Sequence, residues 1–327
     1  MSIFRVPAEI AGQRLDIFLH SELRRTSRTR TQHIVRASAY DASGRRLKPS
    51  DRVAADQHVL LWRPPWDEAP VPTDIDILHE DDHLLAVNKP ALLPVHPTAR
   101  YYRNTLIHIL KSVRDDEFLS LGHRLDRETS GVLLLCKTRE CDRALKKMFE
   151  ARTGVEKMYV ALTWGIPRGV ATNFRFECGM RLDHDCRYKV KMRVADDDDS
   201  FHSSTVLTVE SVRQNALGNS YARVACLLET GRQHQIRLHL ATLGSPVVGD
   251  KLYGPDESAF ARGADGKLTD DDLAKLELPR HALHAARFEL EHPMTGKSLA
   301  IDAPVPADIE GFWSALQMPR GTLSRST

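Results

Sequence analysis

Residues 122–131, GHRLDRETSG, gather a histidine, two arginines and two acids into one short stretch just before the apolar run VLLLCKT. A loop that leads into a buried strand holds its side chains at the rim of a sheet. Asp126 in this loop could act as a nucleophile if a neighbouring cation kept it ionised and correctly oriented. Arginine suits that task, because its planar guanidinium pairs with a carboxylate and lowers the carboxyl pKa.

The candidate partner of this carboxylate is Arg237, in the segment TGRQHQIRLHLATLGSPVVGDKLYG at 230–254. The segment has glycines at expected turns and places this arginine on a short helix. From spacing alone, the Asp126–Arg237 pair is one arrangement among several. A salt bridge that only ties a loop in place is the plain structural alternative.

Other chemistries lack their motifs. No Gly-x-Gly-x-x-Gly supports dinucleotide binding, and no Gly-x-Ser-x-Gly makes Ser130 a nucleophile. His234 and His239 are five residues apart, which spreads them around a helix and disfavours a zinc site. The five cysteines show no Cys-x-x-Cys spacing, which favours reduced thiols over disulfides or a zinc centre. We therefore expect no metal site and no dinucleotide-binding fold.

The composition is that of a globular protein, with 42% hydrophobic and 28% charged residues among 327. No run of eighteen apolar residues predicts a membrane span, and charges within the first twenty residues argue against a signal peptide. We expect a cytoplasmic, monomeric protein with no membrane partner.

Positive charge is concentrated at the amino-terminal end. The whole chain has a net charge of only +2, but residues 1–50 contain ten Lys and Arg against four acids. This asymmetry predicts that the first fifty residues bind an anionic partner, and a solvated basic face is the alternative. Helices are expected over 14–23 and over 27–38, the second with Ser27 as its N-cap.

A proline-rich stretch, WRPPWDEAPVPTD at 62–74, divides the chain. We expect a small domain over 1–63, a linker over 64–74 and a large domain over 75–327. Many predicted strands and few helices indicate an α+β fold with a mixed or antiparallel central sheet. Segments 195–200 and 255–276 are expected to be solvated loops, the second with a short surface helix in its later part. The strands are expected at 83–90, 130–138, 157–165, 203–212, 221–230 and 281–292, and the helices at 139–154, ended by Gly154, and at 232–244, ended by Gly244.

Five segments, in order, resemble the motifs of the RluA family of pseudouridine synthases, and together they span about residues 77–305. The first 63 residues resemble the S4 RNA-binding module, with SAYDASGRRLKPS at 38–50 in place of that module's usual Asn-Gly motif. The five segments are ILHEDDHLLAVNKPALLPVHPT (77–98), HRLDRETSG (123–131), VEKMYVALTWG (155–165), GRQHQIRLHLATLGSPVVGDKLYG (231–254) and HALHAARFELEHPMTG (281–296).

The resemblance implies that the protein isomerises uridine in RNA to pseudouridine without a cofactor, on a nucleotide that has flipped out of its helix. It implies Asp126 as the nucleophile, Arg237 as its orienting partner and Tyr159 as the residue that stacks on the base and could help to move a proton. Attack at the sugar, attack at the base and elimination all stay open. Arg124 is expected to fill the vacated space, His123 to form a structural hydrogen bond, and Lys89 to support the fold or touch phosphate. The residues expected to contact the substrate are Arg124, His123, Lys89 and Arg232. Those expected to contact RNA elsewhere are Arg24, Arg25, Arg28, Arg30 and Arg36.

The layout resembles members that act on large-subunit ribosomal RNA, and transfer RNA is the alternative substrate. A non-catalytic RNA-binding ribosome-assembly factor is the rival from another class, but such a protein has no need of Asp126. A glycoside hydrolase would need two carboxylates flanking the scissile bond, and nothing marks Glu128 as the second.

Overall fold

The computed structural model describes residues 2–23, 27–62, 68–98, 100–170 and 172–319. The chain divides into two compact units, Met1–Asp67 (unit 1) and Glu68–Thr327 (unit 2), each with its own apolar core. Arg24, Arg25 and part of the expected linker lie outside the described residues. Within the described ranges, no helix is both long and apolar enough to cross a membrane.

Unit 1 packs two helices against a small antiparallel sheet in the order β1-β3-β2. Leu15, Phe18 and Leu19 recur at helical spacing and are buried together, which explains why α1 forms and which face it packs. Ser27 caps α2 as predicted, because its hydroxyl accepts the backbone N–H of Arg30. The elements are β1 (Ser2–Arg5), a 3-10 turn (Ala8–Ile10), α1 (Leu15–Glu22), α2 (Arg28–Ser38), β2 (Ala39–Asp41) and β3 (His58–Leu61).

Unit 2 is built on a sheet of 11 strands among the described residues, in the order β10-β9-β11-β12-β8-β13-β7-β5-β4 with β14 beside β13 and β6 beside β7. The named strand pairs are antiparallel except for β13 with β7. The predicted mixed sheet is therefore confirmed. The strands are β4 (Asp76–Glu80), β5 (Leu84–Lys89), β6 (Ser120–Leu121), β7 (Ser130–Cys136), β8 (Val155–Trp164), β9 (Phe174–Leu182), β10 (Met192–Val194), β11 (Phe201–Gln214), β12 (Ser220–Leu228), β13 (Leu283–Glu291) and β14 (Ser298–Asp302).

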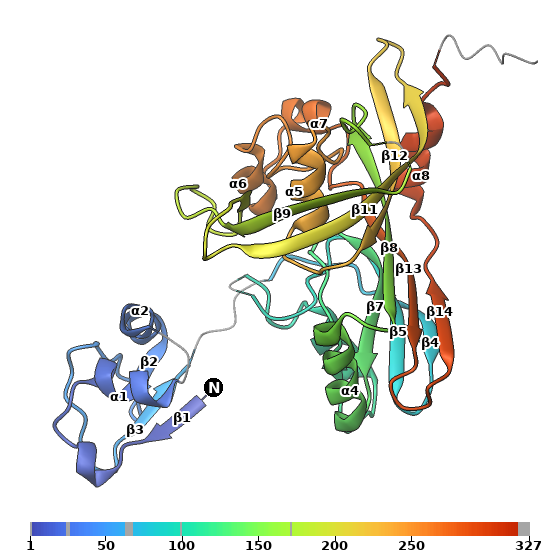
Figure 1. The fold of residues 1–327 in the computed structure, drawn as a ribbon. Coiled ribbons are helices and arrows are strands. Elements are labelled where there is room, and N and C mark those ends of the chain that lie inside the picture. Colours follow the sequence, from blue (N-terminus) through green and yellow to red (C-terminus); the bar gives the residue numbers. More distant parts are fainter. Residues whose placement is uncertain (1, 24–26, 63–67, 99, 171, 320–327) are drawn as a thin grey trace, which may run out of the picture. The chain divides into compact units, whose positions relative to one another are not determined.

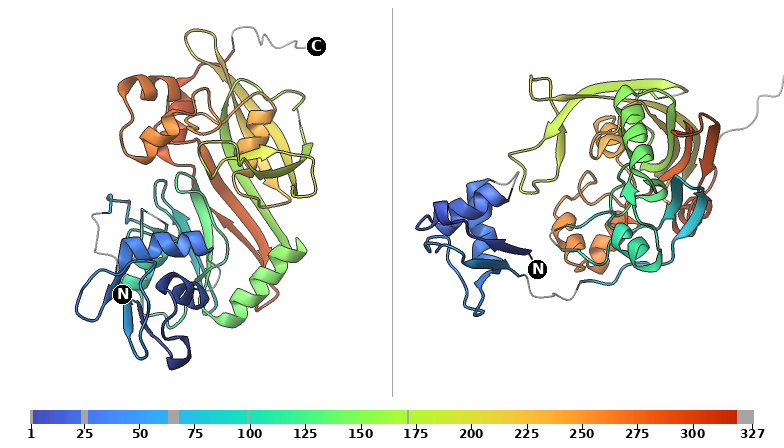
Figure 2. Two further views of the ribbon diagram at one scale, coloured as in Figure 1. Left: turned by 90° about the vertical axis from the view of Figure 1, so that its left-hand side faces the viewer. Right: turned by 90° about the horizontal axis from the view of Figure 1, so that it is seen from below.

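The helices of unit 2 cover different parts of this sheet. α5, α6 and α7 lie together beside β9 and β11, whereas α4 lies at the opposite end of the unit (Figure 1, Figure 2). α8 lies on the other side of β12 and packs Ile309 and Trp313 into the main core (Figure 1). The helices are α3 (Leu106–Val113), α4 (Arg139–Ala151), α5 (Gln235–Thr242), α6 (Ala259–Ala264), α7 (Asp270–Leu276) and α8 (Ala307–Ala315).

The apolar run that follows the opening motif is the central strand β7, and all seven of its residues are buried. Leu133 and Leu135 enter one core cluster, whereas Val132, Leu134 and Cys136 enter another on the opposite face. Because both faces are covered, the strand needs apolar residues at every position. The motif 122–131 therefore ends against the best-buried part of the sheet.

Two predictions about local structure are wrong. The helix expected over 139–154 ends at Ala151, because Arg152 takes the left-handed conformation (φ 55°) two residues before Gly154. In the segment 255–276, the short helix expected in the later part is confirmed as α7, but the earlier part, expected to be a solvated loop, contains α6. The buried Ala259 and Leu276 fix this segment to unit 2.

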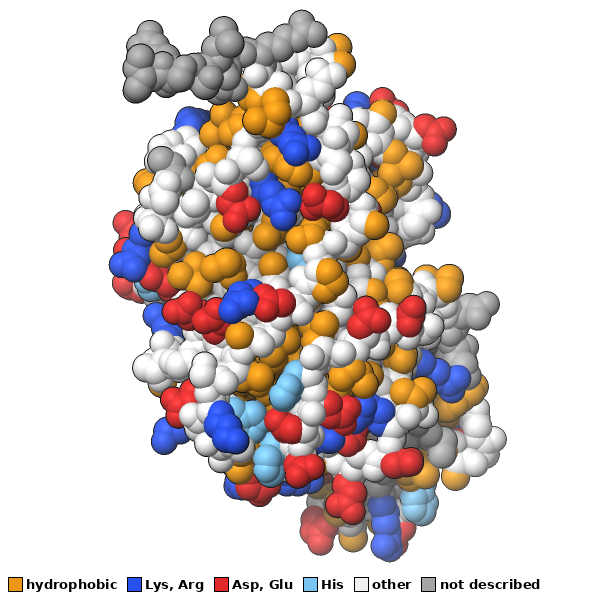
Figure 3. Space-filling model, turned by 90° about the vertical axis from the view of Figure 1, so that its right-hand side faces the viewer, with side chains coloured by type: hydrophobic (Ala, Val, Ile, Leu, Met, Phe, Trp, Pro, Cys, Tyr) orange, Lys and Arg blue, Asp and Glu red, His pale blue; other side chains and the backbone are white. Residues whose placement is uncertain are grey.

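Charge is mixed on the face of the molecule drawn in Figure 3. Among the described residues, Lys and Arg side chains there are interspersed with Asp and Glu instead of forming one continuous basic area (Figure 3). This agrees with the small net charge of the chain. A polyanion would find no continuous positive surface on this face.

Candidate active site

The loop between β6 and β7 holds Asp126 where two central strands meet. β7 begins directly after this loop and runs parallel to β13, with Gly131 opposite Ala285. Gly131 has a φ of +110°, and a Cβ atom at this position would lie 2.2 Å from the carbonyl oxygen of Ala285. Only glycine allows this close approach, which fixes the end of the loop.

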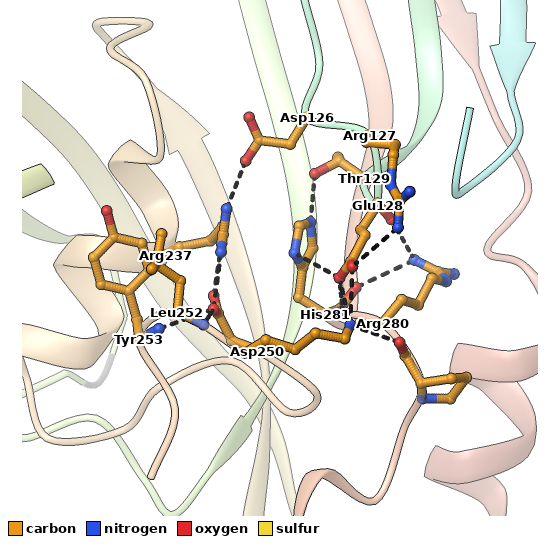
Figure 4. Close-up of polar contacts among 12 residues, drawn as sticks. Asp126, Arg127, Glu128, Thr129, Arg237, Asp250, Leu252, Tyr253, Arg280 and His281 are labelled. Atoms are coloured by element: carbon orange, nitrogen blue, oxygen red, sulfur yellow. Dashed lines mark hydrogen bonds and ion pairs between the residues drawn. The ribbon is translucent and has the colours of Figure 1, made fainter. Parts of the chain in front are cut away.

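Arg237 is the partner of Asp126. It lies on α5, and its Nη1 donates to Oδ2 of Asp126 at 2.9 Å. Its Nε and Nη2 donate to the two carboxylate oxygens of Asp250 at 2.6 and 2.8 Å. Figure 4 shows the guanidinium of Arg237 between the two acids. The Asp126–Arg237 pair, which spacing alone left open, is therefore formed. Asp250 holds the guanidinium and directs it at Asp126.

Asp250 was not predicted. Its side chain is fully buried, and Oδ1 also accepts the backbone N–H groups of Leu252 and Tyr253 at 2.9 and 3.0 Å (Figure 4). These contacts fix the carboxylate, and the bidentate ion pair then fixes Arg237. The sequence signal that could have identified Asp250 is its position thirteen residues after Arg237 in the same motif.

Asp126 is held ionised. Burial alone would raise its pKa, but the charges of His234, Arg237 and His281 (the histidines only where acid protonates them) and the hydrogen bond from Arg237 outweigh burial and hold the pKa well below its ordinary value. Burial lowers the pKa of His234 to about 4 and that of His281 to about 3, so both rings are neutral near pH 7. Arg237 is therefore the permanent cation, and a side-chain exposure of 22% keeps the carboxylate accessible.

His234 is a second neighbour of Asp126 that was not predicted for this role. It caps α5 with a φ of 58°, and its Nε2 lies 3.8 Å from Oδ2 of Asp126. Its Nδ1 lies 3.0 Å from the Tyr253 hydroxyl, which accepts the N–H of Met192 at 2.8 Å. The phenol can donate its single proton to Nδ1, which leaves the N–H of the neutral ring on the side of Asp126.

Glu128 is held from several directions. Lys251 donates to both of its oxygens at 2.9 Å, the backbone N–H of His281 donates to Oε2 at 3.2 Å, and Arg280 donates to its carbonyl oxygen at 3.2 Å (Figure 4). Thr129 hydrogen-bonds the His281 ring at 2.8 Å. These contacts make Glu128 an anchor of the loop.

Three cavities surround the loop, and the exposed Arg124 borders all of them. The first, of about 300 Å³, has Asp126, Arg237 and His234 in its wall. The second, of about 810 Å³, contains Tyr159 and Arg232. The third, of about 590 Å³, contains Asp126 and Arg232. The structure therefore brings Asp126, Arg237, Arg124, Tyr159 and Arg232 to adjoining cavities.

Tyr159 lies on β8, between Cys226 of β12 and Ala285 of β13, and is 6% exposed. Burial and the charge of Asp126 raise the pKa of its hydroxyl well above the usual value. The phenol is therefore protonated near neutral pH. Tyr159 also borders the second cavity.

Lys89 does not reach the substrate side of the loop, and its expected contact with phosphate is wrong. Its side chain has no exposed surface, and its Nζ donates to the carbonyl oxygens of Pro90, Leu93 and Arg127 at 2.7, 3.0 and 3.2 Å. Burial lowers its pKa to about 7. Lys89 instead connects the end of β5 to the loop, one residue from Asp126.

His123 supports the loop from its other end. Its Nε2 accepts the backbone N–H of Leu134 at 3.1 Å, and its ring stacks on Phe288 with centroids 4.7 Å apart. Burial lowers its pKa to about 3, so the ring is neutral. The ring also borders the second cavity.

The expected RNA-contacting arginines belong to unit 1. Arg28, Arg30 and Arg36 lie on α2 and are exposed, and Arg28 also lies 3.7 Å from the buried Asp16. No group of three His, Cys, Asp or Glu within the described ranges is arranged to hold a metal ion.

Comparison with known proteins identifies the class. The sequence model of the RNA pseudouridylate synthase family matches residues 83–242. Two curated relatives are named ribosomal large subunit pseudouridine synthase D. The one from Xanthomonas campestris is 33% identical, over 95% of this chain and 91% of the relative. The one from Neisseria meningitidis is 32% identical, over 97% of this chain and 82% of the relative.

Two solved structures have the same catalytic fold. Human RNA pseudouridylate synthase domain containing 4 is 25% identical, covers 75% of this chain and 94% of its own, and has a TM-score of 0.56. Human RNA pseudouridylate synthase domain containing 1 is 22% identical and covers 78% of this chain and 94% of its own, with a TM-score of 0.58. At this identity it shows the fold alone. This chain belongs to the RNA pseudouridylate synthase family, as its motifs predicted, and it is an enzyme that isomerises uridine in RNA.

Proposed function

We propose that this enzyme converts specific uridines of large-subunit ribosomal RNA to pseudouridine. The observation that carries the proposal is the similarity, over nearly the whole chain, to relatives named for the large ribosomal subunit. Transfer RNA is the alternative substrate from the sequence. We also propose that the enzyme acts as a monomer in the cytoplasm.

The reaction needs no atoms from outside the substrate. The bond from C1′ to N1 of the uracil breaks, the base rotates, and a bond from C1′ to C5 forms. The proton on C5 leaves, and N1 gains one. Because the balance closes within the nucleotide, protein groups that bind, orient and move protons suffice.

We assign nucleophilic catalysis to Asp126. Its carboxylate is ionised, partly exposed and part of a cavity wall, and Arg237 fixes its orientation. A nucleophile of this kind must be aimed before the substrate arrives, because misplacement by about 1 Å can reduce a rate 100-fold. The chain from Asp250 through Arg237 to Asp126 provides this aim.

The substrate must leave its helix to reach this carboxylate, at a cost of about a few kcal/mol in lost pairing and stacking. We assign recovery of part of that cost to Tyr159, since stacking on an aromatic ring contributes about 1–3 kcal/mol per base. We assign to Arg124 the role of filling the space that the nucleotide leaves, and its exposure at the border of all three cavities supports this assignment.

We propose that unit 1 is an S4-like RNA-binding domain. Its separate core, its position before the catalytic unit and the exposed Arg28, Arg30 and Arg36 on one helix support this assignment. Phosphate contacts of this kind add affinity and position the RNA without reading its sequence.

Mapping of pseudouridines in total RNA from cells with and without the gene tests the proposal. We expect sites in large-subunit ribosomal RNA to lose pseudouridine, and the wild-type gene to restore them. A gene carrying Asp126→Asn should not restore them, although we expect this variant to fold and to retain RNA. Loss confined to transfer RNA would refute the substrate, and restoration by Asp126→Asn would refute the role of Asp126.

A further inference from the structure

The third cavity beside Asp126 contains features that isomerisation does not use. It lies in unit 2, and Arg124 and Asp126 form one side of it. The other side comes from β9, β10 and the start of β11 and includes Arg181 and Phe201. A nucleotide in this cavity would therefore be a neighbour of the nucleotide at Asp126.

Phe201 is an exposed aromatic residue at the edge of this cavity. It is the first residue of β11, pairs with Met180 of β9, and leaves 57% of its surface exposed. Exposure of a large aromatic side chain beside a polar cavity is typical of surfaces on which unpaired bases stack. Nothing in the packing of the core requires phenylalanine here, because Phe201 belongs to none of the core clusters of the described residues.

Two arginines accompany this ring. The guanidinium carbon of Arg232 lies 5.2 Å from the ring centroid of Phe201, and Arg232 Nε donates to the carbonyl oxygen of His202 at 3.3 Å. This hydrogen bond holds the guanidinium at the ring, where the cation–π contact keeps the ring in one orientation. Arg232 therefore pre-organises Phe201 and places a positive charge over one face of the ring, which leaves the other face for a base.

Arg181, on β9, supplies the second charge. Its Nη1 lies 3.2 Å from Asp197, in an ion pair in which both side chains are partly exposed. Its Nε is shielded from solvent and forms no hydrogen bond with any described residue. Because the guanidinium of Arg181 is partly exposed at the cavity wall, its charge would attract an anionic oxygen there.

We propose that this cavity is a second nucleotide subsite, in which an unpaired base next to the target uridine stacks on Phe201 while Arg181 and Arg232 bind its phosphate. The inference rests on the proposed function, because it assumes an RNA whose target uridine lies at Asp126. Flipping of the target breaks the stack on both sides of it, and Phe201 replaces one of the lost stacking partners. The subsite thereby favours uridines in loops, where the neighbouring base is free.

A synthetic RNA hairpin with a loop of seven uridines tests the subsite, together with versions in which each loop nucleotide in turn is abasic. Binding is measured by fluorescence anisotropy with the full-length protein. We expect Phe201→Ala to raise the Kd for the intact hairpin by roughly tenfold, the size expected for one lost base stack. Phe201→Tyr should restore the affinity. Leu217→Ala, which removes an 86% exposed side chain at the β11–β12 turn, should leave it unchanged.

The abasic hairpins identify the stacked base. At one loop position, removal of the base should weaken binding by the wild type as much as Phe201→Ala weakens binding of the intact hairpin. Removal of the same base should not weaken binding by the Phe201→Ala variant any further. The subsite would be overturned if every abasic position weakened binding by the wild type and by the variant equally. An unchanged Kd for Phe201→Ala, or a wild type that binds no hairpin, would also overturn it. Pseudouridine formation on transcribed large-subunit ribosomal RNA is measured in parallel. A wild type that shows the base-specific effect without modifying this RNA would refute the proposed substrate and leave the subsite standing.

Discussion

Arg237 connects a buried carboxylate to an accessible one. It binds both oxygens of Asp250, which has no exposed side-chain surface, and one oxygen of Asp126, whose side chain is 22% exposed. The two acids differ in function because of this difference in exposure. Asp250 can only hold the guanidinium, whereas Asp126 can also meet a substrate.

Replacement of Arg237 by lysine tests whether the fork of the guanidinium is needed. An ammonium group keeps the charge but cannot make two parallel bonds to Asp250 while reaching Asp126. We expect Arg237→Lys to lower kcat about 10- to 100-fold with a small change in KM, because orientation is lost and RNA contacts are not. Initial rates of pseudouridine formation, with circular dichroism as the check on folding, measure this. A kcat equal to that of wild type would show that charge alone suffices.

Replacement of Lys89 by methionine tests its supporting role. The substitution keeps most of the side-chain volume but leaves the carbonyl oxygens of Pro90, Leu93 and Arg127 without their donor. We expect a loss of about 3 kcal/mol in the free energy of unfolding and a lower kcat, since the Asp126 loop loses its attachment. Chemical denaturation and steady-state rates provide the two readouts. Unchanged stability with a raised KM would instead place this ammonium on RNA.

The sequence predicted the sheet from its strand patterns and the key ion pair from its resemblance to family motifs. Strands such as β7 are long and apolar enough to be recognised alone, and Asp126 and Arg237 lie in segments that resemble family motifs. Strand β9 was missed because charged residues alternate with its apolar ones, and short β6 and β10 have too few residues to show a period.

Other features depend on tertiary contacts that a sequence pattern does not contain. Lys89 looks like a phosphate ligand until the structure shows three carbonyl oxygens around its amine. His234 is directed at Asp126 only because Tyr253, nineteen residues later, contacts the other ring nitrogen. The end of α4 at Ala151 depends on a non-glycine residue in a left-handed conformation, which residue type alone does not predict.

Stability should fall as the pH is lowered below neutrality. Burial lowers the pKa of His123 and His281 to about 3 and that of His234 and His239 to about 4 in the folded state. Unfolded chains bind these protons below about pH 6.5, so each neutral buried ring costs up to about 2 kcal/mol of stability between pH 7 and pH 5. The depressed carboxyl pKa values of Asp126 and Asp250 act in a lower window, below about pH 4.

Urea denaturation at pH 7, 6 and 5 measures this dependence. His239→Gln removes one fully buried ring that lines none of the three cavities. The free energy of unfolding of this variant should therefore vary less with pH, by about the contribution of one group. The comparison uses the slope and not the absolute stability, which the substitution also changes. A wild type equally stable at pH 7 and pH 5 would contradict the neutral, buried state of these histidines.

Removal of unit 1 tests whether it binds RNA. Residues 68–327 form a compact unit with a separate core, so the truncated enzyme should fold and retain its catalytic ion pairs. We expect weaker RNA binding and a higher KM, with kcat on saturating RNA largely preserved. Each phosphate contact that is lost should reduce the slope of log K against log salt by about 0.7–0.9, because fewer counterions are released. In the full chain, Arg30→Gln and Arg36→Gln together should produce part of the same change. An unchanged affinity and salt slope after truncation would refute the assignment of unit 1 as an RNA-binding domain, whatever its fold resembles.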